Sequence, residues 1–185
     1  MRNKNVLVTG GAGFIGSHTA VALTEAGYGV ILVDDLSNSD MSAVEGVREI
    51  TGHNVAFEQV DCTDRDALAE VFDKYAFNSV IHFAASKAVG ESVGKPLLDY
   101  RNNLVSVINV LDLVRETGVE NIGFSSSATV DGHPDELPAG ETAPRKPATS
   151  PYGNTKQICE DILSDSLTAY KGLKGIALRY FNPIG

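Results

Sequence analysis

The sequence has 185 residues, of which 43% are hydrophobic and 21% are charged, as in an ordinary globular protein that buries a core of its own. Its formal net charge of −9 argues against a general nucleic-acid binder and against attraction to anionic membranes. No apolar run approaches the ~20 residues that span a bilayer, and no secretory signal is visible, so we expect a cytoplasmic protein. Its two cysteines, Cys62 and Cys159, are far apart and fit reduced thiols better than a disulfide or a metal site.

The first patterned stretch, residues 5–18, is NVLVTGGAGFIGSH. An apolar run typical of a buried strand leads into Gly10, Gly11, Gly13 and Gly16, and a helical pattern runs from residue 14 to residue 26. These glycines fit two overlapping patterns, GxGxxG and GxxGxxG. Without Cβ atoms the backbone can approach a pyrophosphate, which the helix N-terminus behind it also favours. An ordinary turn between strand and helix is the alternative.

Strand and helix patterns alternate along the rest of the chain. Buried-strand patterns cover residues 30–33, 55–60, 79–83, 121–125 and 175–181, and helical patterns cover residues 41–50, 64–74, 97–116 and 151–170. Loops are expected at residues 34–39, 84–96 and 131–150. This alternation predicts an α/β protein with a Rossmann-like, doubly wound parallel β-sheet and helices on both faces.

Polar residues gather where the predicted strands end. Asp34 follows the second strand, about 20 residues after the glycines, where a carboxylate holds the adenosine ribose of NAD. Asp61 follows the third strand, and three serines at residues 125–127 follow the fifth. Ligands of parallel sheets bind at this carboxyl edge, so we expect a site there. Asp34 could instead be a turn residue only, and Asp61 could instead cap a helix.

Tyr152 and Lys156 lie four residues apart on a predicted helix, so their side chains share a face. A neighbouring ammonium favours the phenolate and lowers the pKa of a tyrosine. A hydroxyl among residues 125–127 could lie between a substrate oxygen and Tyr152, although serines at a strand end also cap backbone. The alternative for the pair is two unrelated surface residues. The four histidines show no metal-ligand spacing, so no metal site is expected.

Six motifs together carry a family resemblance: NVLVTGGAGFIGSH, VDDLSNS, HFAASKAVGESV, FSSSATV, SPYGNTK and LRYFNPIG. Over essentially its whole length the chain resembles the extended short-chain dehydrogenase/reductase family, and within it the nucleotide-sugar 4-epimerases. The resemblance implies a tightly held NAD and a UDP-sugar substrate. It further implies interconversion of UDP-galactose and UDP-glucose through a 4-keto intermediate, in galactose metabolism. A tyrosine would take the proton of the sugar 4-hydroxyl while hydride passes to the nicotinamide.

The resemblance also implies roles for the matching residues. Ser127, Tyr152 and Lys156 would be catalytic, and Lys156 would also bridge the nicotinamide ribose hydroxyls. The cofactor would be bound by Gly10, Gly13, Phe14, Ile15, Gly16, Asp34, Asp35, Leu36, Ser37, Asn38, Ser39, Asp61, Cys62, Phe83, Ala84, Ala85, Ser86, Lys87, Asn102, Ser127, Tyr152, Lys156 and Phe181. The substrate would be bound by Lys87, Ser127, Tyr152 and Asn182. Lys87 could instead be solvated, and Asn102 and Asn103 could serve only the loop backbone.

The chain departs from this family in one side chain and in length. Asp131 stands where the family usually has a tyrosine, and we expect an effect on packing only. Family members continue beyond the last motif into a substrate domain. We therefore expect residues 1–185 to form the NAD-binding Rossmann domain, with the C-terminal substrate domain absent from this chain. The full-length form would be a homodimer.

Other functions compete with epimerisation. Nucleotide-sugar dehydratases carry an Asp-Glu pair where this chain has Ala128 and Thr129, neither of which can act as a carboxylic acid or base. Dehydration is therefore disfavoured. Another NAD-dependent nucleotide-sugar epimerase or a decarboxylase stays open. An NAD-binding module without independent activity also stays open, and NAD binding without turnover would distinguish it.

Overall fold

A computed structural model of the chain describes residues 4–86, 89–133, 140–141 and 143–184. Its elements are, in chain order, β1 (Asn5–Thr9), α1 (Phe14–Glu25), β2 (Gly29–Asp34), α2 (Met41–Thr51), β3 (Ala56–Gln59), α3 (Arg65–Lys74), β4 (Ser79–His82), α4 (Val89–Gly94), α5 (Pro96–Thr117), β5 (Asn121–Ser127), the 3-10 helix η1 (Ala128–Asp131), α6 (Pro151–Ala169) and β6 (Lys174–Tyr180). Every described strand, and every described helix except α4 and η1, overlaps a predicted one.

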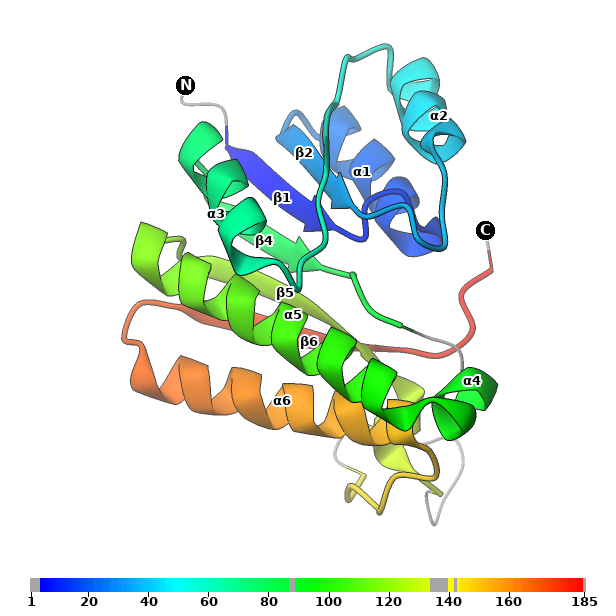
Figure 1. Cartoon of the computed structure of the whole chain (residues 1–185). Coiled ribbons are helices and arrows are strands. Elements are labelled where there is room, and N and C mark those ends of the chain that lie inside the picture. The colour runs from blue at the N-terminus through cyan, green and yellow to red at the C-terminus, as the bar shows by residue number, and fades with distance from the viewer. Residues whose placement is uncertain (1–3, 87–88, 134–139, 142, 185) are drawn as a thin grey trace.

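All six described strands form one parallel sheet in the order β3-β2-β1-β4-β5-β6. The chain builds outward from β1 to β3 and then returns to pair β4 with the other side of β1 (Figure 1). The predicted Rossmann-like, doubly wound fold is therefore confirmed. The strand order reverses between β1 and β4, and ligands of such sheets bind outside the carboxyl ends of the strands at this point.

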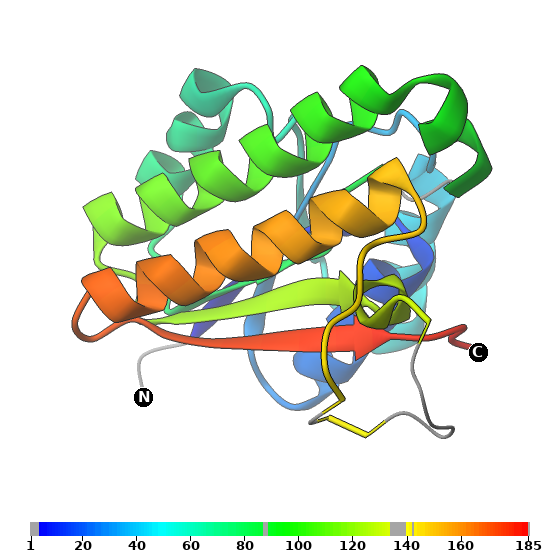
Figure 2. The same ribbon diagram turned by 90° about the horizontal axis from the view of Figure 1, so that it is seen from below.

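Helices cover both faces of the sheet. On the α1 and α2 face, Val6 and Val8 of β1 belong to one buried cluster. On the other face, Leu7 of β1 joins Val110 of α5 and Leu163 of α6 in a second cluster. Figure 2 shows α5 and α6 side by side on that second face. β1 is thus buried on both sides, as expected for an inner parallel strand. Within the described part of the chain, no helix is long and apolar enough to cross a membrane.

The structure differs from the predicted loops in two places. The stretch expected to be a loop before α5 contains the short helix α4, although Gly90 and Gly94 lower its helix propensity. Its contacts with α5 and α6 explain this difference. β5 continues two residues further than predicted, because its ladder with β6 extends to the pair Ser127 and Tyr180. η1 follows at once, so the serines form the end of a strand.

β6 is the edge strand of the sheet, and one of its sides is largely uncovered by the described residues. Ile176 and Leu178 are 58% and 43% exposed, and they pair with Gly123 and Ser125 of β5. We call Gly123, Ile176 and Leu178 the open face. The opposite side of β6 lies against α6, where Gly175 sits close to the Leu167 side chain. At this edge of the sheet, a helix of the described chain therefore covers only one of the two faces.

Candidate active site

A cavity of about 820 Å³ lies along the carboxyl edge of the sheet. Residues that follow all six strands line it, together with residues of α5 and α6. The described residues with predicted binding or catalytic roles all line this cavity except Leu36 and Ser39. Lys87, predicted to bind both cofactor and substrate, lies outside the described residues. The structure thus brings together residues that are 172 positions apart in sequence, from Gly10 after β1 to Asn182.

The turn between β1 and α1 forms one wall of the cavity. Gly10 has φ +67°, a left-handed conformation that favours glycine. A Cβ atom on Gly16 would overlap the carbonyl oxygen of Gly10, so the helix can approach the turn only with glycine there. Within the described residues, no side chain caps the helix at Gly13, and no acidic residue lies in its first turn. The first N–H groups of α1 therefore offer donors to an anion.

Asp34 ends β2 with a buried carboxylate that backbone and hydroxyl donors hold in place. Its Oδ2 accepts a hydrogen bond from Ala12 N at 3.0 Å, and its Oδ1 accepts from Leu36 N at 3.0 Å and Ser39 Oγ at 2.8 Å. An ionised carboxylate has about four acceptor positions, so capacity is left toward the cavity. Leu36 and Ser39 do not line the cavity, but they fix the carboxylate that does.

The segment after β3 contributes Asp61 and Cys62. Asp61 Oδ1 accepts from Thr63 N at 2.8 Å, whereas the helix cap of α3 is Asp64, which accepts from Ala67 N at 3.1 Å. The alternative role of Asp61 as a helix cap is therefore wrong. Burial raises the pKa of the Cys62 thiol to about 12, with smaller contributions from nearby carboxylates.

Both cysteines are buried and free, in agreement with the prediction of two reduced thiols. Burial raises the pKa of Cys159 as well, to about 11. A thiol acts as a nucleophile through its thiolate, so neither cysteine is suited to covalent chemistry at neutral pH.

Two asparagines of α5 hold the segment that follows β4. Asn103 Oδ1 accepts from Ser86 N at 2.8 Å, while its Nδ2 donates to Ser86 O at 3.1 Å and to Thr155 Oγ1 at 3.0 Å. Asn102 Nδ2 donates to Ser86 Oγ at 2.9 Å. Asn103 therefore bonds the loop backbone, as its alternative role required, whereas Asn102 contacts a loop side chain and also lines the cavity.

Tyr152 lies in the first turn of α6, which begins with Pro151 and is capped by Ser150 Oγ accepting from Gly153 N at 3.0 Å. Burial raises the pKa of Tyr152, while a hydrogen bond with the Ser127 side chain lowers it and the charge of Asp99 raises it. The phenol of the ligand-free chain is thus harder to ionise than usual. This corrects the expectation from sequence, because burial outweighs the lowering effect of Ser127.

Lys156 is buried one turn after Tyr152. Its Nζ donates to Ser125 O at 2.8 Å and lies 4.9 Å and 5.9 Å from the ring centroids of Phe124 and Tyr152. Burial lowers the pKa of Lys156 to about 8, against a smaller effect of Cys159 that raises it. The site therefore contains a poorly solvated ammonium next to the phenol.

The three serines at the end of β5 have different partners. The carbonyl oxygen of Ser125 accepts a hydrogen bond from Lys156 Nζ. The Ser126 hydroxyl donates a hydrogen bond to Glu160 Oε1 at 2.5 Å. Ser127 Oγ accepts from Thr129 N at 3.2 Å and from Thr129 Oγ1 at 3.0 Å, which caps η1. Of the three side chains, that of Ser127 affects the pKa of Tyr152, which it lowers.

Several residues that line the cavity had no predicted role. Tyr180 ends β6 opposite Ser127, and the rule that sites lie at strand ends would have indicated it. Leu98 and Ser106 flank Asn102 at spacings of four residues on α5, so one helix face carries all three.

His82 is buried behind the site. Its Nδ1 lies 2.7 Å from Thr9 Oγ1 and its Nε2 lies 3.5 Å from Ser106 Oγ. Burial, and to a smaller extent the charge of Lys156, lower the pKa of His82 to about 3, so the ring is neutral. Among the described residues, no group of three or more metal-type ligands occurs.

This geometry agrees with the comparison to known families. The model of the NAD dependent epimerase/dehydratase family matches residues 6–185. The chain therefore belongs to the NAD-dependent epimerase/dehydratase family, which confirms the resemblance found in the sequence.

Its relatives carry a more specific name. The chain is 49% identical to UDP-glucose 4-epimerase 2 of Arabidopsis thaliana, over 98% of this chain and 53% of that protein. It is 47% identical to UDP-glucose 4-epimerase of Homo sapiens, over 98% of this chain and 54% of that protein. The crystal structure of UDP-glucose 4-epimerase from Bifidobacterium longum in complex with NAD⁺ and UDP matches with a TM-score of 0.96 and 47% identity, over 98% of this chain and 54% of that chain. The chain spans about half the length of the curated relatives it matches.

Proposed function

We propose that this chain supplies the NAD-binding and catalytic part of a nucleotide-sugar 4-epimerase, which interconverts UDP-galactose and UDP-glucose through a 4-keto intermediate. One observation carries the proposal: a single cavity is lined both by the glycine turn with Asp34 and by Ser127, Tyr152 and Lys156. The first group suits a dinucleotide, and the second suits proton transfer. The names of the relatives support the substrate class.

The residues present fit NAD. The uncapped N-terminus of α1 and the glycines before it would hold the pyrophosphate, and Asp34 would accept the hydroxyls of the adenosine ribose. Phe83 and Phe181 would lie along the cofactor, since both line the cavity. When bound, NAD would supply the acceptor and donor of the hydride, as a cofactor that is regenerated in each cycle.

The chain's own residues would handle the proton of the sugar 4-hydroxyl. Tyr152 would receive it as the phenolate, and Ser127, whose side chain lowers the pKa of Tyr152, would connect the sugar oxygen to that phenolate. Lys156 would favour the phenolate through its charge, 5.9 Å from the ring centroid. Burial of Tyr152 and Lys156 would limit the access of water to the proton.

A second candidate is an NAD-binding module that has no turnover of its own. A dehydratase is a weaker candidate, because Ala128 and Thr129 line the cavity where an acid and a base would be required.

The test joins the chain to the C-terminal region of the Arabidopsis thaliana relative and incubates the fusion with UDP-galactose and NAD. Chromatography should show UDP-glucose and no net formation of NADH. Tyr152→Phe in the same fusion should lower turnover by about 10²–10⁴ and leave NAD binding intact. A 4-keto-6-deoxy sugar as product would contradict epimerisation. NAD binding without turnover in the fusion would favour the binding module.

A further inference from the structure

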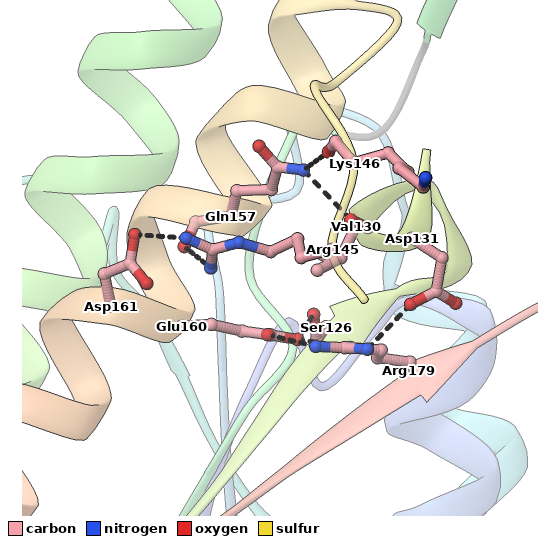
Figure 3. Close-up of polar contacts among 9 residues, drawn as sticks. All are labelled: Ser126, Val130, Asp131, Arg145, Lys146, Gln157, Glu160, Asp161 and Arg179. Carbon is pink, nitrogen blue, oxygen red and sulfur yellow. Dashed lines mark hydrogen bonds and ion pairs between the residues drawn. The ribbon is translucent and has the colours of Figure 1, made fainter. Parts of the chain in front are cut away.

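A buried group of charged residues lies behind the candidate catalytic residues. Arg179, near the end of β6, contacts Asp131 Oδ1 through Nη1 at 2.7 Å, and its Nε and Nη2 contact Glu160 Oε1 and Oε2 at 2.9 Å and 2.8 Å. The hydroxyl of Ser126 donates to the same Glu160 at 2.5 Å. Figure 3 shows Arg179 between the two carboxylates. We call these four residues the Arg179 cluster.

The Arg179 cluster is held by directed contacts away from solvent. The side chains of Asp131 and Glu160 are only 9% and 13% exposed, and that of Arg179 is 29% exposed. Burial raises the pKa of Glu160, but hydrogen bonds from Arg179 and Ser126 outweigh it, and the pKa lies below its ordinary value. Buried ion pairs add little net stability compared with apolar packing, whereas a forked arginine fixes geometry. The cluster is therefore better suited to holding elements in register than to stabilising the chain.

The two ends of the cluster flank Ser127. Ser126 precedes Ser127 and is tied to Glu160, while Asp131 lies at the far end of η1 and is tied to Arg179. Because Arg179 also forms an ion pair with Glu160, both contacts lead to the same pair of side chains, Arg179 and Glu160. The backbone on each side of Ser127 is thus anchored to the same pair of side chains.

The same pair of side chains fixes the position of α6. Glu160 lies one turn after Lys156 and two turns after Tyr152, so all three project from neighbouring positions along one side of the helix. Lys156 also donates to Ser125 O, which gives α6 a second tie to the end of β5. Glu160 and Lys156 therefore tie α6, which carries Tyr152, to the strand end that carries Ser127.

A further contact supports η1 from the α6 side. Gln157 Nε2 donates to Val130 O at 2.9 Å and to Lys146 O at 2.6 Å (Figure 3). These bonds hold the backbone of η1 but involve no charge. Asp131 adds the contact that links η1 to β6, which no bond of Gln157 makes.

We infer that Arg179, together with Asp131 and Glu160, is a positioning residue that holds the end of β5 and the start of η1, and with them the Ser127 hydroxyl, beside Tyr152 in the cavity. The inference rests on the proposed function, in which Ser127 and Tyr152 together carry the proton of the sugar. Its test does not need turnover, so a failure of the proposed function and a failure of this inference can be distinguished.

The test measures the pKa of Tyr152 in the chain itself. The chain is labelled with 3-fluorotyrosine, whose phenol titrates in a milder pH range, and followed by ¹⁹F NMR. Tyr152→Phe assigns the signal among the six tyrosines. Ser127→Ala removes the hydroxyl directly and should raise the pKa of Tyr152 by about 0.5 or more, because a hydrogen bond to the phenolate is lost. Arg179→Gln, Arg179→Lys and Asp131→Asn should each raise this pKa in the same direction.

Asp131→Asn separates positioning from simple charge effects. Loss of a negative charge alone would lower the pKa of a nearby phenol, whereas displacement of Ser127 raises it. The other charged groups that face Tyr152, Lys156 of α6 and Asp99 of α5, are unchanged in this variant. Asp161→Asn is the matched control, since Asp161 pairs with Arg145 at 2.8 Å on the exposed side of α6 and should leave the titration unchanged.

A double substitution gives the sharpest outcome. If the Arg179 cluster acts through Ser127, then Ser127→Ala added to Arg179→Lys should raise the pKa of Tyr152 no further. Full additivity of the two shifts would overturn the inference, and so would a lowered pKa in Asp131→Asn. An unchanged pKa in Ser127→Ala would overturn it as well. If circular dichroism shows that Arg179→Gln does not fold, the pKa of Tyr152 in the two milder variants provides the test. Arg179→Lys keeps the positive charge, and Asp131→Asn keeps the shape of the side chain.

Discussion

Lys156 places an ammonium in the interior of the chain, with Ser125 O as its hydrogen-bond partner. Burial lowers its pKa to about 8, whereas a lysine in the unfolded chain has a pKa near 10.4. Below pH 8 both states carry the charge, and the folded state bears the full cost of burying it. Between about pH 8 and pH 10.4 the unfolded state binds more protons than the folded state, so the contribution of Lys156 to stability rises with pH.

Lys156→Met should therefore stabilise the ligand-free chain at pH 7, by up to about 3 kcal/mol if the burial of charge dominates. The advantage should shrink between pH 8 and pH 10. NAD affinity should fall in the same variant, because a donor to the nicotinamide ribose is lost under the proposed function. Urea unfolding at several pH values and calorimetric titration measure the two effects. A variant that is less stable than the parent at pH 7 would show that the contacts of the ammonium outweigh its desolvation.

Sequence patterns predicted which residues meet in the site, but not their protonation. The four-residue spacing of Tyr152 and Lys156 was sufficient to place both on one face of α6. The direction of the pKa shift of Tyr152 depends on how deeply α5, α6 and β5 bury it, which no local pattern contains. The Arg179 cluster was not predicted for the same reason, since Asp131, Glu160 and Arg179 come from three separate elements.

The turn between β1 and α1 is the element that most directly shapes the candidate cofactor site. A Cβ atom at Gly16 would overlap the backbone of Gly10, whereas a Cβ atom at Gly46 in α2 would have no heavy atom within 4 Å apart from its chain neighbours and the backbone of its own helix. Both glycines lie in helices, so they share a helical backbone conformation. They differ in the atoms that surround them.

Gly16→Ala should destabilise the chain by about 1–3 kcal/mol, because the turn must shift to relieve the overlap. Gly46→Ala should stabilise it by about 0.5–1 kcal/mol, because alanine loses less backbone entropy in a helix. Urea unfolding gives both values, and NAD titration should show loss of affinity for Gly16→Ala only. Equal effects of the two substitutions on stability and on NAD affinity would contradict a role for the close approach between Gly16 and Gly10.

Elements were predictable where local pattern and tertiary packing agree. The buried strands are short apolar runs, and α5 ends at Gly118, which has φ +72°. α4 was not predicted, because Gly90 and Gly94 argue against a helix until the contacts with α5 and α6 are known. The extension of β5 to Ser127 depends on its register with β6, which is set between strands and not within one.

At the scale of the whole molecule, the sheet is covered unevenly. The open face exposes Ile176 and Leu178 on β6, while the core behind the same strand is closed by α6. Adjacent exposed apolar side chains on an edge strand form a surface to which hydrophobic probes bind.

Replacing Ile176 and Leu178 together by threonine should lower the fluorescence of a bound hydrophobic dye and leave the fold intact, because threonine also favours strands. Ile50→Thr is the control, since Ile50 on α2 is exposed but lies outside the open face. Dye titration with circular dichroism provides the comparison. Equal dye binding by the parent and the double variant would place the accessible apolar surface elsewhere.

Calorimetric titration of the chain with NAD⁺ and with NADP⁺ tests the central claim, that the cavity at the carboxyl edge is an NAD site, most directly. Asp34, fixed by Ala12 and Ser39 at the end of β2, can accept ribose hydroxyls and would repel a 2′-phosphate. We expect NAD⁺ to bind more tightly than NADP⁺, and Asp34→Ala to reduce the difference. Equal affinity for the two cofactors, or tighter binding of NADP⁺, would contradict the assignment.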